Sequence, residues 1–380
     1  MEAELKAWRA TVRDFVEAEI PREYIRETDA KHKPPLEAWE KIAAQGWLGF
    51  MAPEEYGGLG TDIRPAAILL EEVGRRSNDL AVMLFRTILH CNMRLSWDGT
   101  AEQREFYIPR AIRGEINFAL GISEPDTGND VASLTTRASR AESGWVINGH
   151  KMWTTGFQLS DYCIVLARTS PTSESRHRGL TSFIVDSKSS GITHREIPTL
   201  GRWPVPTGEV WFDDVAVTDS SVIGAVDDGW AGIMRHLAAE RFCSASIWLG
   251  EATAAFEDSL EYAKARTQFG NPIGNYQAIA HKLANMHIQI EAARALMDTV
   301  QDSIEAGHPD RSQVAAMKVF VADTFKGVAL DAMQICGGFG YSMEMDVQRY
   351  VRDSLLAPIG PGSNEVMRNV IAKGMGLSPN

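Results

Sequence analysis

The feature that most restricts the fold is an unbroken helical pattern of about 35 residues from Asp228 to Ala265. A helix of this length rises about 50 Å, so it needs other helices to cover its apolar face. Comparable patterns at 276–305 and 310–337, and a last helix after Asn364, predict a helical bundle. Side chains that recur every three or four residues form the stripe of the long helix: Met234, Leu237, Ala238, Arg241, Ala245, Trp248, Leu249 and Ala252.

The rest of the chain divides in two. Residues 1–117 also have a helical period, whereas residues 118–226 are rich in β-branched and aromatic residues between frequent turns. Within the second region, Asn148-Gly149 predicts a type I′ hairpin turn, because both residues tolerate positive φ, with Trp153 on the returning strand. The sequence therefore predicts an α+β fold with a helical part (1–117), an antiparallel β part (118–226) and a helical part (227–380).

Composition narrows the function classes. The net charge is −12 and no block of five or six basic residues occurs, which argues against nucleic acid or an anionic membrane as partner. No apolar run approaches the ~20 residues of a membrane helix. The first residues, MEAELKAWRATVRDF, do not read as a signal peptide, so we expect a cytoplasmic protein. The four cysteines are far apart and the histidines are scattered, which predicts buried thiols and no metal site.

Three glycine-containing motifs are weak signals when taken singly. Residues 118–134 place backbone N–H groups and small hydroxyls close together, as a polar cofactor would need, but a plain loop with two turns explains them too. Residues 265–277 join two helices, with Arg266 suited to the C-terminal helix dipole. Glycines in residues 334–340 let a backbone approach a diphosphate, yet no strand precedes them as in a Rossmann motif.

Taken together and in order, these segments resemble the acyl-CoA dehydrogenase family over nearly the whole chain. The matching segments are APEEYGGLG, ISEPDTGND, NGHKMWTTG, FDDV, AERF, YAKARTQFGNPIGNYQ, QICGGFG and RDSLLAPIGPGSNEVMRNVIAKGMG. The resemblance implies an N-terminal helical domain, a middle antiparallel β domain and a C-terminal four-helix bundle. It also implies FAD between the β and C-terminal domains at a subunit contact, and a homotetramer.

The resemblance also implies site residues and a reaction. The implied FAD contacts are Leu120, Ile122, Ser123, Trp153 and Thr155 near the flavin, Arg266, Phe269, Gln277, Gln334 and Gly338 partly from a neighbouring subunit, and Ser363 and Glu365 at the last helix. The implied reaction is α,β-dehydrogenation of an acyl-CoA thioester. A carboxylate removes the α-proton, hydride passes to flavin N5, and electron-transfer flavoprotein accepts the electrons.

One departure from the family pattern affects the base. Many members have Glu-Gly-Thr before the last helix, where this chain has Pro361-Gly362-Ser363, and proline offers neither a proton acceptor nor an N–H. Isovaleryl-CoA and long-chain members instead take the base from a Glu-Arg pair on the long helix, which matches Glu240 and Arg241 here. The other interpretation of Glu240 is an ordinary helix glutamate that pairs with His236.

The remaining predictions concern the substrate. Asn129 stands where the family usually has Ser or Thr, and we expect Asn129, Arg241 and Gly362 to contact the substrate. Trp153 could shorten the acyl pocket, as could Phe242 and Trp248, although core packing is the favoured interpretation for each. Two alternatives to a dehydrogenase with Glu240 as base stay open at this point. One is a flavin-dependent monooxygenase or elimination enzyme on the same fold, and the other is a non-catalytic FAD-binding partner subunit.

Overall fold

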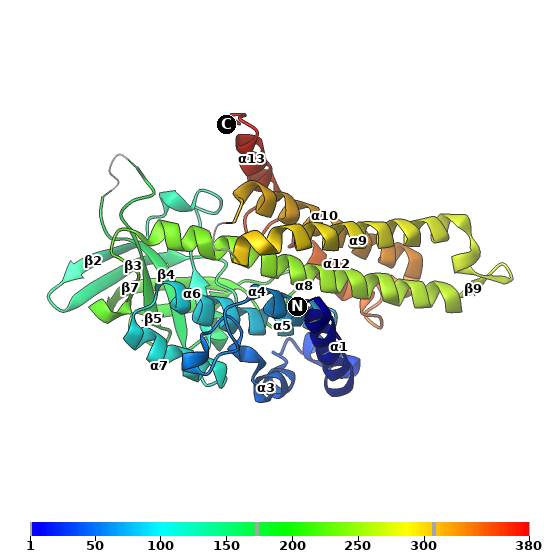
Figure 1. Ribbon diagram of the computed structural model, residues 1–380, viewed down its shortest axis with the longest axis horizontal. Coiled ribbons are helices and arrows are strands. Elements are labelled where there is room, and N and C mark those ends of the chain that lie inside the picture. Colours follow the sequence, from blue (N-terminus) through cyan, green and yellow to red (C-terminus); the bar gives the residue numbers. More distant parts are fainter. Residues whose placement is uncertain (1, 172–174, 306–308, 380) are drawn as a thin grey trace.

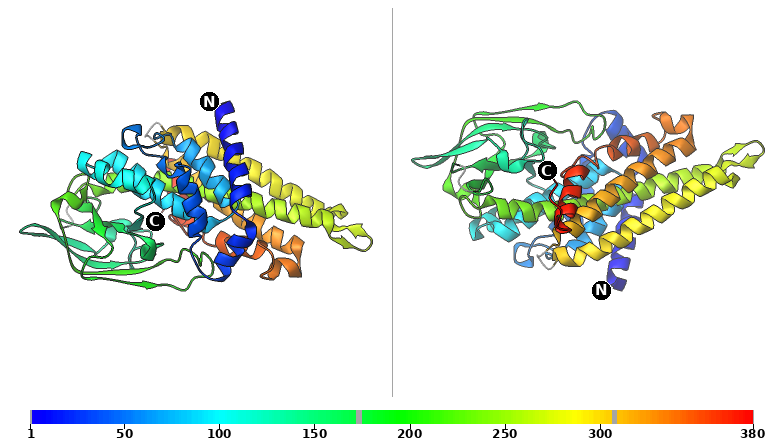
Figure 2. Two further views of the ribbon diagram at one scale, coloured as in Figure 1. Left: turned by 90° about the horizontal axis from the view of Figure 1, so that it is seen from below. Right: turned by 90° about the horizontal axis from the view of Figure 1, so that it is seen from above.

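A computed structural model describes residues 2–171, 175–305 and 309–379. The molecule is elongated, with the β-sheet at one end, a long helical bundle running to the other end, and the N-terminal helices along one side (Figures 1 and 2). The N-terminal elements are α1 (Glu2–Glu19), α2 (Arg22–Ala30), α3 (Leu36–Ala44), α4 (Ile63–Gly74), α5 (Asn78–Phe85), the π-helical segment η3 (Arg86–Met93), α6 (Arg94–Asp98) and α7 (Ala101–Ile112). The helical prediction for this part is confirmed.

The middle of the chain forms one sheet. Among the described residues it has eight strands, in the order β6-β7-β3-β2-β4-β5-β8 with β1 against β4. Most neighbours are antiparallel as predicted, but β1 lies parallel to β4, and β2 meets β4 in parallel at one residue pair. The strands are β1 (Phe118–Gly121), β2 (Arg137–Ala141), β3 (Gly144–Lys151), β4 (Tyr162–Arg168), β5 (Leu180–Asp186), β6 (Ile192–Glu196), β7 (Gly208–Val217) and β8 (Val222–Ile223).

The predicted turn at Asn148-Gly149 is wrong. Both residues lie inside β3, which continues to Lys151, and the turn before β3 falls at residues 142–143. The glycine has a packing reason instead, since a methyl group on Gly149 would lie 2.3 Å from Thr136 Oγ1. The pairing of β3 with β7 shifts register between Ile147 and Gly149, so this glycine marks a bulge with a close side-chain approach.

The C-terminal half is the predicted bundle. The long helix α8 spans Gly229–Ala265, and α9 (Gln277–Glu305) and α10 (Arg311–Cys336) pack beside it. A short hairpin of β9 (Thr267–Gln268) and β10 (Asn271–Pro272) forms the tip between α8 and α9 (Figure 1). The last helix α13 (Asn364–Gly374) projects from the bundle, whereas α11 (Gly338–Tyr341) and α12 (Val347–Ser354) were not predicted.

Glycines let α4 and α8 come into backbone contact. A methyl group on Gly250 would lie 2.1 Å from the carbonyl oxygen of Glu71, and one on Gly74 would lie 2.8 Å from that of Ile247. Contacts this short exclude any side chain at either position. The N-terminal helices are thereby fixed against the same helix that α10 covers from another side.

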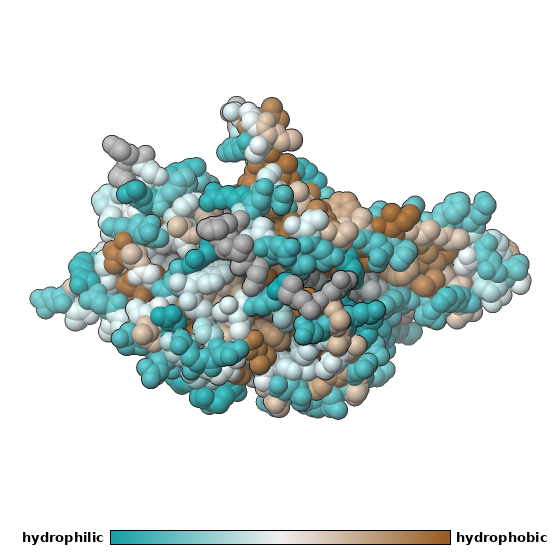
Figure 3. Space-filling model, viewed as in Figure 1, coloured by the Kyte–Doolittle hydropathy of each residue, from teal (hydrophilic) through white to brown (hydrophobic). Residues whose placement is uncertain are grey.

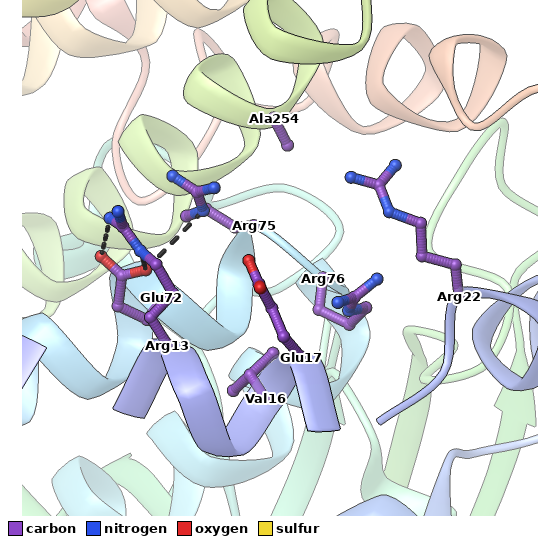
Figure 4. A pocket seen from close by; sticks show the side chains of 8 residues that line it. All are labelled: Arg13, Val16, Glu17, Arg22, Glu72, Arg75, Arg76 and Ala254. Carbon is purple, nitrogen blue, oxygen red and sulfur yellow. Dashed lines mark hydrogen bonds and ion pairs between the residues drawn. The ribbon is translucent and has the colours of Figure 1, made fainter. Parts of the chain in front are cut away.

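A buried carboxylate joins α1 to α4. Glu72 is 1% exposed and pairs with Arg9 at 2.7 Å. It also pairs with Arg13 at 2.9 Å, and Arg75 approaches to 3.7 Å (Figure 4). Burial would raise the pKa of Glu72, but the arginines outweigh it and hold the pKa below its usual value. The cavity beside this cluster measures about 20 Å³, room for about one water molecule.

The surface and the thiols add two observations. No helix in the described part of the chain is long and apolar enough to cross a membrane. All four cysteines are buried and free, as predicted. Apolar surface gathers toward the far end of the bundle and on the projecting C-terminal segment (Figure 3), where the exposed side chains include Phe269, Tyr341, Met343, Met375 and Leu377.

We expect Gly149→Ala to lower the free energy of unfolding by about 2 kcal/mol, because the methyl group overlaps Thr136. Gly327→Ala in α10 is the matched control, since the new methyl group meets only Gln289 Oε1 at 3.7 Å. This control should raise stability by about 0.5 to 1 kcal/mol through helix propensity. Urea unfolding of both variants gives the two values. Equal stability of Gly149→Ala and the parent chain would contradict the packing argument.

Candidate functional site

The predicted site residues fall into two groups. The first surrounds the junction of the sheet, α8 and α13. Its sheet residues are Leu120 at the end of β1, Ile122 and Ser123 just after it, and Trp153 and Thr155 just after β3. The two loops are joined directly, because the backbone N–H of Met152 donates to the carbonyl oxygen of Ser123 at 2.8 Å.

A buried ion pair lies under these two loops. Lys151 Nζ is 2.9 Å from Glu124 Oε1 and donates to the carbonyl oxygen of Ile122 at 3.0 Å. The backbone N–H groups of Thr135 and Thr136 also donate to the Glu124 carboxylate. Burial alone would raise the pKa of Glu124, but Lys151 and these hydrogen bonds lower it to about 2. The pair therefore fixes the backbone at Ile122 and Ser123, two of the predicted flavin contacts.

The loop before α13, residues 359–363, contacts the segment that follows β1. Ser363 is the N-cap of α13, with its hydroxyl accepting from the Val366 N–H at 3.3 Å, and its own N–H donates to Asn129 Oδ1 at 3.3 Å. Arg241 Nε donates to the carbonyl oxygen of Pro361 at 3.2 Å. The predicted substrate contacts Asn129, Arg241 and Gly362 thus gather around one loop.

A buried lysine holds the start of α13. Lys318 in α10 is fully buried and donates from Nζ to Asn364 Oδ1 at 2.8 Å, and Asn364 Nδ2 donates to Asp323 at 2.8 Å. Burial, with the nearby Arg241 charge, lowers the pKa of Lys318 to about 8. Lys318 was not predicted, although a lysine within the apolar run VAAMKVFVAD carries the same signal as Arg241 on its apolar stripe.

Glu240 lies one residue before Arg241 on α8, with its side chain 16% exposed. Burial raises its pKa to about 7, against a lowering effect of Arg241. Glu240 Oε2 is buried without a hydrogen-bond partner among the described residues and lies 3.6 Å from His236 Nε2. The predicted contact with His236 exists, but burial keeps the pKa of His236 well below its usual value, so the contact joins no opposite charges.

The second group lies at the tip of the bundle. Arg266 caps the C-terminus of α8, about 39 Å from Glu240 along the helix axis at 1.5 Å per residue. Its other predicted members are Phe269, Gln277, Gln334 and Gly338, all exposed. A cavity of about 570 Å³ opens there beside Arg266, Gly337 and Gly338. The structure thus brings the predicted residues together in two separate places rather than in one.

The residues present fit the FAD that the resemblance implies. At the tip, a cation lies beside glycines where added methyl groups at positions 337 and 338 would meet nothing within 4 Å, which suits a diphosphate. At the sheet, Trp153 is 53% exposed at a positive φ of 62°, so core packing is the wrong interpretation for it. Phe242 and Trp248 are buried, as core packing requires. The two groups of one chain lie far apart along α8. A single FAD would therefore contact both kinds of residue only if a second subunit supplied the tip.

Comparison with known proteins bears on the whole chain. Residues 2–115, 119–215 and 227–376 match the N-terminal, middle and C-terminal domains of acyl-CoA dehydrogenase. The chain is 33% identical to the 3-(aryl)acrylate reductase of Clostridium sporogenes, covering 97% of both chains. It is 34% identical to the mitochondrial isovaleryl-CoA dehydrogenase of Solanum tuberosum, covering 88% of this chain and 81% of that one. The solved structure of butyryl-CoA dehydrogenase from Megasphaera elsdenii has a TM-score of 0.92 at 30% identity, covering 98% and 97%.

We expect Lys151→Met to lower stability at pH 7 by about 3 kcal/mol, because it leaves the buried Glu124 carboxylate without its cation. The folded pKa of Glu124 is depressed, so its contribution is complete above about 4.5 and is lost as the pH falls toward about 2. The gap between parent and variant should narrow over that range in urea unfolding. The double variant Lys151→Met/Glu124→Gln should lose less than Lys151→Met alone, and an equal or larger loss would contradict the pairing.

Proposed function

The chain belongs to the acyl-CoA dehydrogenase family, whose members are FAD-dependent oxidoreductases acting on CH–CH groups, and from this premise we propose that Glu240 is its catalytic base. Glu240 takes the α-proton of the acyl thioester. The observation that carries the proposal is a glutamate near the start of α8 whose burial raises its pKa to about 7. A carboxylate in a dry environment has the proton affinity that removal of a weakly acidic C–H requires.

Position 361 supports the same assignment. Pro361 cannot accept a proton, and its carbonyl oxygen is already bonded to Arg241, the neighbour of Glu240. Family members carry the base at one of two positions, which correspond to 240 and 361 here. The two positions lie in one region of this chain, and only position 240 has a carboxylate. The thioester oxygen also needs donors, because negative charge develops there. We assign that role to the Gly362 N–H and the Arg241 guanidinium. The guanidinium lies close to this glycine, because a methyl group added to Gly362 would be 3.5 Å from it.

The proposed cofactor contacts are the two groups described above. Ser123, Trp153 and Thr155 would hold the flavin end, with Leu120, Ile122, Ser363 and Glu365 beside them, and the tip residues of a second subunit would hold the diphosphate and adenosine. FAD when bound supplies the hydride acceptor of the reaction. The residues of the chain orient the thioester, exclude water and hold the abstracted proton on Glu240.

The substrate and partners follow from the relatives as proposals. Relatives named for isovaleryl-CoA and for 3-(aryl)acrylate favour a short branched or aryl-substituted acyl group. Electron-transfer flavoprotein is the proposed electron acceptor. A homotetramer is the proposed assembly, as the family resemblance implies. The exposed Phe269 and Tyr341 at the tip support association of subunits, because a second subunit would cover them.

The first experiment is an anaerobic titration of the FAD-loaded protein with a panel of acyl-CoA thioesters, following the oxidised-flavin absorbance. Bleaching by branched or aryl acyl-CoA identifies dehydrogenation and the substrate class. If no thioester bleaches the flavin, a parallel assay for oxygen-dependent product tests the monooxygenase alternative. The monooxygenase alternative stays open because Pro361 has no backbone N–H to donate to a thioester oxygen.

Glu240→Gln should slow bleaching by about 10³-fold, because the amide cannot accept the proton. Glu261→Gln is the matched control, since Glu261 lies exposed on the same helix and pairs with the exposed Lys264. In the parent protein, kcat/KM should fall about tenfold per pH unit below about 7, where Glu240 becomes protonated. Normal bleaching by Glu240→Gln would show that the base lies elsewhere.

A further inference from the structure

Two buried histidines, His236 next to Glu240 and His90 next to His236, have no role in the reaction as proposed so far. His236 is on α8, one turn before Glu240, and is fully buried. His90 is on η3 and is 6% exposed. Their rings are tilted by 35° with centroids 5.2 Å apart, and His90 Nδ1 is 3.2 Å from His236 Nε2.

His236 Nε2 has two neighbours that compete for one proton. It lies 3.2 Å from His90 Nδ1 and 3.6 Å from Glu240 Oε2. Catalytic hydrogen bonds are often this long before substrate binds and shorten in the complex. Glu240 Oε2 has no hydrogen-bond partner among the described residues, so His236 is the group placed to supply one.

The tautomer of His236 decides whether it can do so. The other ring nitrogen, Nδ1, is also buried without a partner in the described part of the chain. A proton on Nδ1 would be a buried N–H donor with no acceptor, and it would leave the Nε2 lone pair facing a carboxylate. A proton on Nε2 avoids both costs and gives His90 Nδ1 a donor, so the arrangement favours the Nε2–H tautomer.

The surrounding charges keep both rings neutral. Burial and the nearby Arg86 lower the pKa of His90 to about 3, and burial, His90 and Arg94 lower the pKa of His236. On the Glu240 side, the facing groups are Arg241, whose charge lowers its pKa, and Cys243, a buried thiol. Among the described residues, neither Arg241 nor Cys243 donates a hydrogen bond to Oε2, which leaves the neutral imidazole at 3.6 Å as the donor placed to reach it.

The geometry points to His236 as a positioning residue: its Nε2–H is shared between His90 Nδ1 and Glu240 Oε2 and so holds that oxygen, which leaves Oε1 to take the substrate proton. The hydrogen bond stabilises the ionised carboxylate and thereby offsets part of the effect of burial. His236 touches no reacting atom and acts only through Glu240. This inference deepens the proposed function and rests on Glu240 as the base.

The test measures the carboxyl group directly. Infrared titration of the FAD-loaded protein follows the carboxylic C=O band of Glu240, identified by its loss in Glu240→Gln, and the midpoint of the parent protein is the reference value. His236→Leu removes the donor and should move the midpoint up by about one pH unit, the size expected for one hydrogen bond to a charged group. His236→Gln restores an N–H donor and should bring the midpoint back toward the parent value.

Controls separate this role from a structural one. His287→Leu, an exposed ring on α9, should leave the midpoint unchanged. Flavin content and the thermal midpoint report whether His236→Leu is folded, and His236→Met, which also lacks the donor, carries the test if it is not. An unchanged or lowered midpoint in a folded His236 variant that lacks the donor would overturn the inference, and a lowered one would mean that Nε2 presents its lone pair.

The titration and the reaction are independent readouts. If Glu240→Gln still bleaches the flavin normally, the proposed base is wrong, yet the infrared midpoint still decides whether His236 holds the carboxylate. If Glu240→Gln is inactive and the midpoint does not respond to His236→Leu, the base is right and its positioning by His236 is wrong. When both hold, the acid limb of kcat/KM should shift with the infrared midpoint.

Discussion

The backbone contact between α4 and α8 is the constraint on which the rest of the structure depends. Gly250 and Gly74 bring the two helices so close that a single methyl group would meet a carbonyl oxygen. This contact fixes the N-terminal helices on one side of α8 while α10 covers another side. The position of Glu240 relative to η3, and with it the distance from His236 to His90, follows from that packing.

Charges are placed unevenly around the site. Arg241 and Lys318 are cations beside the loop at 361–363, while within the described ranges Glu240 has no oppositely charged partner other than the adjacent Arg241. Burial therefore acts on the carboxylate almost unopposed, and its pKa rises. Glu124 shows the opposite outcome, because it is also buried but has Lys151 and two backbone donors. Two glutamates of one chain thus have different proton affinities because their partners differ.

The helices were predicted from the sequence because their apolar residues repeat with the helical period. The bounds of α8 and α9 came from the 3.6-residue pattern, and Arg241 stood out because it is a charge on an apolar stripe. Gly149 was misinterpreted because its reason is Thr136, which precedes the neighbouring strand β2 and comes close only once β2 and β3 pair. His90 was not predicted at all, since its partner is 146 residues away and a lone histidine in a helix carries no periodic signal. The roles of the individual site residues stay predictions.

The separation of Glu240 from Arg266 along α8 has a consequence for how the cofactor is retained. If the flavin end and the diphosphate end are held by different subunits, neither subunit alone offers a complete binding surface. FAD affinity then becomes linked to subunit association, because each stabilises the other by mass action. Dilution would release cofactor even though no residue of the flavin loop had changed. On the proposed assembly, the length of α8 would therefore make FAD binding depend on the quaternary structure.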